Sequence, residues 1–163
     1  MQAVAMSWKT ILVPHDFSAS SEHAVAIARD EAKLHGAAIV LLHVVEMMHN
    51  YGPETELMVR PGTSTPVMKR LYYTEQAEAD LAPVVAALAA DGITATIAVR
   101  SGAPVEEIRE YVRDHPVDAI VMGTHGRTGL RHLIIGSVAE QIVRTSPVPV
   151  LTIRHPDAPT SAS

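Results

Sequence analysis

Short apolar runs alternate with longer stretches of helical periodicity along most of the chain, and this alternation restricts the fold more than any other feature. The runs are rich in β-branched residues and too short for helices, which is typical of strands buried on both faces. The five predicted strands are Thr10–Val13, Ala38–Val45, Thr94–Val99, Val117–Met122 and Val148–Ile153. Strands that alternate with helices form βαβ units, so the sequence predicts an α/β fold with an open, parallel, Rossmann-like sheet and helices on both faces.

Helix signals stand between the strands where this fold needs them. Serines from Ser18 to Ser21 offer N-caps for a helix that would end at Gly36, a residue suited to the position after the last turn. Pro104 begins another helix, and the last helix should cover about Leu133–Arg144. We therefore expect one domain over residues 1–154, followed by a disordered Pro-, Ala- and Ser-rich tail at 155–163.

One region does not follow the pattern. The segment from Glu46 to Pro66 contains three prolines and two glycines, which favours irregular structure, and a lid is one interpretation. The next helix should begin with Thr65 as N-cap and Pro66 in its first turn, and continue to about Asp91. Because Pro83 lies inside that helix, we expect a kink or a break near Asp80.

Composition excludes several classes of protein. Of 163 residues, 47% are hydrophobic, and the formal charge is −5, so a nucleic-acid-binding surface is not expected. With no cysteine, the chain has no disulfides, thiolate metal sites or cysteine nucleophiles. No membrane-spanning run or signal peptide is recognisable, which predicts a soluble, cytoplasmic protein that does not bind membranes.

The segment from Val121 to Ser137 carries the strongest signal for a ligand. A buried strand leads into a loop with Gly123 and Gly126, and then into Gly136-Ser137 near the start of a helix. Backbone N–H groups in such a loop and at a helix N-terminus favour a phosphate, although the same glycines also suit a turn and a helix cap. Arg127 could neutralise a polyphosphate. Neither a P-loop nor a dinucleotide-binding glycine motif is present.

The spacing Gly123-x2-Gly126-x9-Gly136-Ser137 resembles the nucleotide-binding branch of the universal stress protein family. The resemblance covers about residues 8 to 154. It also includes Ile11-Leu-Val-Pro-His-Asp-Phe-Ser18, Leu41-Leu-His-Val44, Gly102-Ala-Pro-Val-Glu-Glu-Ile108 and Ser146-Pro-Val-Pro-Val-Leu151.

The resemblance implies a strand order of 3-2-1-4-5 with ATP between the ends of strands 1 and 4, which is also where ligands lie in open α/β sheets. By motif position, the adenine and ribose side would be formed by Pro14, Asp16 and Val44. Met122 and Gly123 would line the nucleoside. The phosphates would be held by Gly126, Gly136, Ser137 and Val138, with Arg127 beside them.

Asp16 has a second interpretation, since it could simply cap the first helix. Position 15 is His, whereas many family members carry a small or β-branched residue there, so contacts at the adenine edge are expected to differ. The only metal that we expect is Mg²⁺ or Mn²⁺ bound together with the phosphates.

Three classes of function remain open from the sequence. The leading hypothesis is an ATP-binding stress-response module whose nucleotide state alters its partner contacts. The alternative is a slow ATPase or an autophosphorylating enzyme, although no catalytic lysine or base is evident. The third is a structural protein with a vestigial crevice. Pro147 and Pro149 mark the last strand, about Val148 to Ile153, as an edge, and the resemblance implies a homodimer through it.

Overall fold

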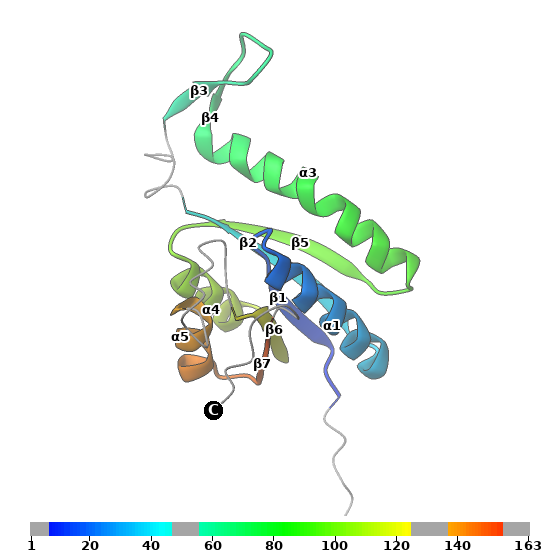
Figure 1. The fold of residues 1–163 in the computed structure, drawn as a ribbon. Coiled ribbons are helices and arrows are strands. Elements are labelled where there is room, and N and C mark those ends of the chain that lie inside the picture. The colour runs from blue at the N-terminus through cyan, green and yellow to red at the C-terminus, as the bar shows by residue number, and fades with distance from the viewer. Residues whose placement is uncertain (1–6, 47–55, 125–136, 155–163) are drawn as a thin grey trace, which may run out of the picture.

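Five parallel strands form the central sheet of the protein, whose computed structural model describes residues 7–46, 56–124 and 137–154. The strand order is β5-β2-β1-β6-β7, as Figure 1 shows, which confirms the predicted order 3-2-1-4-5. The strands are β1 (Thr10–Pro14), β2 (Ala38–Val45), β5 (Ala95–Ser101), β6 (Ala119–Gly123) and β7 (Val150–Ile153). The predicted fold class is therefore confirmed.

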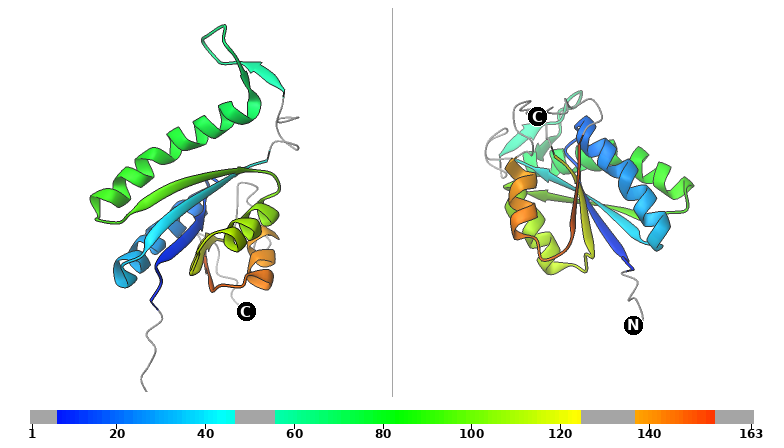
Figure 2. Two further views of the ribbon diagram at one scale, coloured as in Figure 1. Left: turned by 180° about the vertical axis from the view of Figure 1, so that it is seen from behind. Right: turned by 60° about the horizontal axis from the view of Figure 1, so that its bottom comes forward.

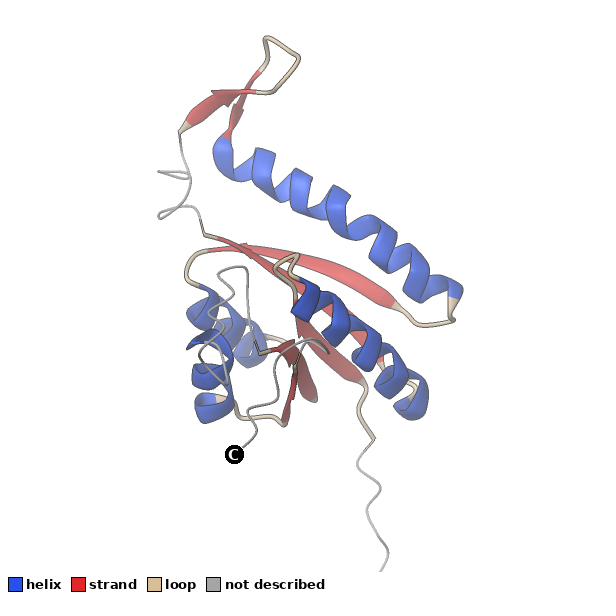
Figure 3. Cartoon of the chain, viewed as in Figure 1, coloured by secondary structure: helices blue, strands red, loops and turns tan. Residues whose placement is uncertain are grey.

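Helices cover both faces of the sheet, two on each (Figure 3). Helices α1 (Ala19–His35) and α3 (Lys69–Ala90) lie on one face, and α4 (Pro104–Asp114) and α5 (Ser137–Thr145) on the other. The core divides in the same way. Ile11 and Val13 of β1 belong to the cluster under α1 and α3, while Leu12 belongs to the cluster under α4 and α5. Because consecutive residues of β1 face opposite core clusters, Ile11, Leu12 and Val13 must all be apolar.

The ends of α1 follow the sequence signals. Ser18 is the N-cap, and its side chain accepts a hydrogen bond from the backbone N–H of Ser21. Gly36 ends the helix in the left-handed conformation, with φ of 68°, and its backbone N–H donates to the carbonyl oxygen of Ala32.

The expectation that Glu46 to Pro66 lacks regular structure was wrong for its second half. Strands β3 (Leu57–Val59) and β4 (Pro66–Met68) form an antiparallel hairpin that is separate from the central sheet. The left view of Figure 2 shows the hairpin beyond the sheet, at the amino end of α3. Within its turn, the Thr63 hydroxyl donates to the backbone oxygen of Arg60. The turn residues of this segment therefore connect two strands instead of breaking all structure.

Two expectations for α3 were also wrong. The helix begins at Lys69, with Met68 as N-cap, because Thr65 and Pro66 belong to the hairpin. It then runs unbroken through Pro83. Leu81 and Leu88 are buried against the sheet on either side of the proline, whereas Pro83 itself is exposed, so packing holds the helix together across the lost backbone hydrogen bond.

Strand β5 starts one residue later than the sequence suggested, and β6 and β7 each start two residues later. Before β6, the Asp118 carboxylate accepts hydrogen bonds from the backbone N–H groups of Lys9 (2.7 Å) and Thr10 (2.9 Å), so the strand begins at Ala119. Strand β7 begins at Val150, after the prolines, and forms the predicted edge of the sheet. The predicted start of α5 near Leu133 and the tail at 155–163 lie outside the described residues.

No helix in the described part of the chain combines the length and apolarity needed to span a bilayer.

Candidate functional site

The chain reverses its winding direction between β1 and β6, which are neighbours at the centre of the sheet. From β1 the chain adds β2 and β5 on one side, and β6 and β7 are added on the other. The paired register between β1 and β6 consists of Ile11 with Ala119 and Leu12 with Ile120, and both strands continue beyond it. Ligands of open α/β sheets bind at the carboxyl ends of strands at such a point.

A tight turn follows β1 at this edge. The Asp16 carboxylate accepts hydrogen bonds from the backbone N–H of Ser18 (3.1 Å) and from the Ser18 hydroxyl. Because Ser18 is the N-cap of α1, Asp16 does not cap the helix directly; it fixes the residue that does. Asp16 remains partly exposed at the end of β1, where it can also face a ligand.

Two histidines and a phenylalanine pack together beside Asp16. The Phe17 ring lies edge-on to His15, with centroids 5.2 Å apart, and 4.8 Å from the ring of His43 on β2. Phe17 has φ of 63°, a left-handed conformation that is unusual for any residue other than glycine. No role for His43 was expected from the sequence, yet its Nδ1 lies 2.7 Å from the backbone oxygen of His15 and donates to it.

His15 is buried, with 4% of its surface exposed. Burial lowers the pKa of its imidazole, and the nearby His43 lowers it further, while Asp16 and Glu22 act in the opposite direction. The net shift is downward, so the ring is neutral near neutral pH.

The remaining predicted residues on the strands differ in how they can reach a ligand. Pro14 is the last residue of β1, and Val44 is half-buried near the end of β2. Met122 is 4% exposed and packs in the core cluster with Leu12 and Ile142. Its side chain is thus committed to the core.

Gly123 has a packing role that the sequence did not indicate. A Cβ atom at this position would meet Ser20 in the first turn of α1, coming within 2.8 Å of its backbone carbonyl carbon. Ser20 is itself buried. The absence of a side chain at Gly123 therefore allows the end of β6 to approach α1, a requirement that holds with or without a ligand.

Helix α5 begins with two predicted phosphate-binding residues. Ser137 is exposed in the first turn, and Val138 packs at the edge of the core cluster beneath α4 and α5. Since the helix joins the parallel strands β6 and β7, its first turn faces the edge of the sheet where those strands end. Gly126, Arg127 and Gly136 lie outside the described residues.

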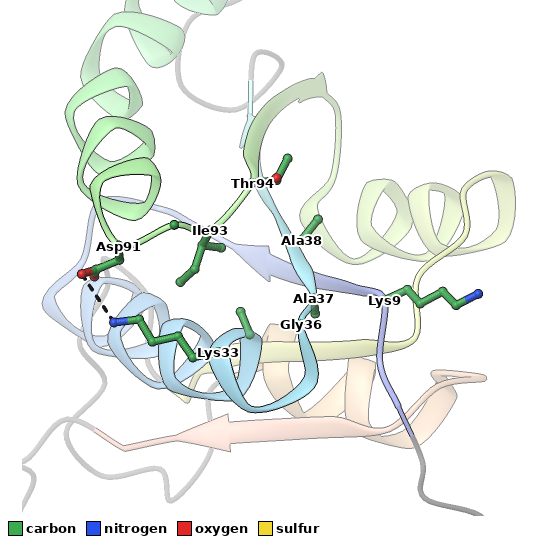
Figure 4. Close-up of a pocket in the computed structure, with 10 residues that line it drawn as sticks. Lys9, Lys33, Gly36, Ala37, Ala38, Asp91, Ile93 and Thr94 are labelled. Atoms are coloured by element: carbon green, nitrogen blue, oxygen red, sulfur yellow. Dashed lines mark ion pairs between the residues drawn. The ribbon is translucent and has the colours of Figure 1, made fainter.

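A separate pocket opens at the opposite edge of the sheet, where β1, β2 and β5 begin (Figure 4). It has a volume of about 470 Å³ and includes Lys9, Gly36 and Thr94 in its lining. An ion pair at its rim joins Lys33 of α1 to Asp91 at the end of α3, with 3.4 Å between Nζ and the carboxylate oxygen. None of the predicted nucleotide residues lines this pocket.

Among the described residues, no three His, Asp or Glu side chains lie together in a way that could hold a metal ion.

The sheet order and the reversal between β1 and β6 define a doubly wound α/β protein of the kind that binds ligands at the carboxyl edge. The family model described as the universal stress protein family matches residues 7–154, and the chain belongs to this family.

Relatives match nearly the whole chain. A universal stress protein of Thermus aquaticus is 31% identical over 148 residues, which are 90% of this chain and 99% of the relative. The solved structure of MJ0577, a universal stress protein of Methanocaldococcus jannaschii, is 28% identical, with a TM-score of 0.73 over 90% of this chain and 95% of the other.

Two more distant structures in the family contain adenine nucleotides. One is a complex of an Archaeoglobus fulgidus universal stress protein with dAMP, with 21% identity and a TM-score of 0.61. It covers 91% of this chain and 99% of the other. The second is a universal stress protein in complex with cAMP, also 21% identical, with a TM-score of 0.60 over 91% of this chain and 98% of the other. Members of the family therefore bind nucleotides.

Proposed function

We propose that this protein binds ATP at the carboxyl edge of β1 and β6 and acts as a nucleotide-dependent switch. The observation that carries the proposal is the convergence of three features at one edge: the partly exposed Asp16 after β1, the end of β6 at Gly123, and the first turn of α5 at Ser137. A carboxylate suits ribose hydroxyls, and a helix N-terminus suits phosphates.

The residues fit an adenine nucleotide in a particular way. Since the Met122 side chain is held in the core, the end of β6 would contact the nucleoside through backbone atoms. Pro14 and Val44 would provide apolar contact on the base side. Gly126, Arg127, Gly136, Ser137 and Val138 would hold the phosphates, and Mg²⁺ or Mn²⁺ would accompany them. The complexes of relatives with dAMP and cAMP support adenine as the base.

We further propose that the protein is a homodimer through β7. This strand is an edge, and the apolar side chain of Leu151 on it is exposed, which favours cover by another chain. A second copy of β7 across a two-fold axis would cover it.

Mass spectrometry of small molecules released by acid from the purified protein tests the choice of ligand. We expect an adenine nucleotide in the extract. Calorimetry with ATP then tests the site: Gly126→Val and Gly136→Val should abolish binding, because each side chain would fill the phosphate region. Ala86→Val, at an exposed position of α3, serves as the control. Wild-type affinity in both folded variants would place the phosphates elsewhere.

A further inference from the structure

We infer that His15 is a positioning residue for nucleotide binding: its imidazole holds the turn after β1 in the conformation that presents Asp16 at the edge of the sheet. The inference rests on the proposed function, because it concerns the same site. It goes beyond that function in assigning a role to a buried histidine that need not touch the ligand itself.

The first support is a hydrogen bond within the turn. The backbone N–H of Phe17 donates to His15 Nδ1 over 3.3 Å. Phe17 has the left-handed φ of 63°, which costs free energy in a residue with a Cβ and persists only when its surroundings hold it. A side-chain acceptor two residues earlier is a common way of holding such a turn, as in turns formed by asparagine and aspartate.

This hydrogen bond also defines the form of the imidazole. Because Nδ1 accepts, it carries no proton, and the proton of the neutral ring is on Nε2. Nε2 is buried without a hydrogen-bond partner in the described part of the chain. An apolar side chain would fill the same space without that unpaired donor, so the benefit of a histidine here lies at Nδ1.

Contacts from β2 hold the same turn from the other side. The Nδ1–H of His43 donates to the backbone oxygen of His15. The imidazole rings of His15 and His43 each contact the ring of Phe17. The backbone on both sides of Asp16 is thereby restrained, at His15 and at Phe17. The carboxylate is restrained too, through its hydrogen bonds with Ser18.

Protonation of His15 would undo this arrangement. A proton on Nδ1 would place two donors, the imidazole and the Phe17 amide, against each other. The groups that influence His15 are Asp16 beside it, His43 from β2 and Glu22 from α1. Nucleotide affinity should therefore fall in acid as the turn is released.

Two variants distinguish the contribution of Nδ1 from that of Nε2. His15→Asn keeps an acceptor close to Nδ1 and lacks the distant donor, while His15→Gln keeps a donor near Nε2 and lacks the near acceptor. By calorimetry with ATP at about pH 7.5, we expect His15→Asn to bind within about threefold of wild type, and His15→Gln to bind roughly tenfold more weakly, the effect of one lost hydrogen bond.

The pH dependence provides a readout that a purely structural role would not change. As the pH falls from about 7.5 through the folded pKa of His15, which burial holds below 6.5, wild type should lose more affinity than His15→Asn does, since only the imidazole at this position can be protonated. His115→Asn, at the end of α4, is the control and should behave as wild type. Titration of the ATP phosphates is common to all of these proteins and cancels in the comparison.

The outcomes separate the role of His15 from the proposed function. If wild type binds no adenine nucleotide, the proposed function fails. If wild type binds ATP but the asparagine and glutamine variants are equal to each other, the role of His15 is wrong and the proposed function stands. Should either variant fail to fold, the decision falls to nitrogen-15 NMR of the wild-type imidazoles: an unprotonated Nδ1 at His15 supports the inference, and a protonated one overturns it.

Discussion

Gly123 at the end of β6 lies so close to Ser20 of α1 that a Cβ atom on the glycine would approach the Ser20 carbonyl carbon to 2.8 Å. Part of that contact is with backbone, which cannot rotate away as a side chain can. The candidate site thus shares a residue with the packing of the first helix, so a substitution at Gly123 would affect stability before it affected a ligand.

We expect Gly123→Ala to lower the free energy of unfolding by about 1–3 kcal/mol, the usual cost of overpacking. Urea denaturation measures it. Adding Ser20→Gly should restore only part of the loss, because the contact with the backbone of residue 20 remains. If Gly123→Ala has the stability of wild type, this close approach does not constrain the fold.

Pro83→Ala should stabilise α3. The proline is exposed within an unbroken helix and cannot donate to the carbonyl oxygen four residues earlier, so alanine should raise the free energy of unfolding by about 1–3 kcal/mol. Thermal and urea denaturation should agree. An unchanged urea midpoint would mean that the helix already compensates for the missing hydrogen bond.

Stability should also depend on pH through His15. In the unfolded chain its pKa is close to 6.5, and in the folded protein burial lowers it, so below that pH the unfolded state binds more protons. The free energy of unfolding should therefore decrease as the pH falls from 6.5 towards the lower folded pKa. Urea denaturation across this range should show a smaller decrease for His15→Asn than for wild type, and equal slopes would contradict the buried neutral ring.

Val150→Lys should convert a dimer into a monomer, because it places a charge on the edge strand β7 that we propose as the interface. Light scattering at micromolar concentration should give twice 17.5 kDa for wild type and 17.5 kDa for the variant. Leu34→Lys, on the exposed end of α1, is the control and should leave the mass unchanged. A monomeric wild type would refute the interface.

ATP should bind without rapid turnover. No base for water activation is evident, so phosphate release should remain far below about 1 per second, the lower end of ordinary enzymatic rates. Hydrogen exchange across residues 127–137 should nevertheless slow when ATP binds, because phosphates would engage their backbone N–H groups. Release at 1 per second or faster, lost in folded Asp16→Ala or Ser137→Ala, would instead identify an ATPase.

The sheet was predictable because its signals are local. Long, mainly apolar strands such as β2 can only be buried on both faces, which places them inside the sheet. Strand β7 is the edge as predicted, although the prolines at 147 and 149 lie before it and not within it. The hairpin was missed because Pro61 and Gly62, between β3 and β4, are as common in irregular loops as in tight turns. The course of α3 through Pro83 depended on burial of Leu81 and Leu88, which no local pattern shows.

For the candidate site, the sequence located the ends of the elements that carry it but not the contacts between those elements. Asp16 and Ser137 follow from a strand end and a helix start, both of which can be located in the sequence. The packing of Gly123 on Ser20 joins residues about a hundred positions apart, and the contact of His43 with His15 joins two strands. Such contacts depend on the register between elements, so only the folded structure can display them.

The position of β1 at the centre of the sheet has a consequence for synthesis on the ribosome. One of its edges can pair with β2 soon after residue 45 emerges, but the other must wait for β6, which begins at Ala119. For that interval the nascent chain carries a strand whose backbone N–H and C=O groups are unpaired along one side. The pairing of β1 with β6, and with it the proposed site, therefore cannot form before the chain has been made beyond residue 119.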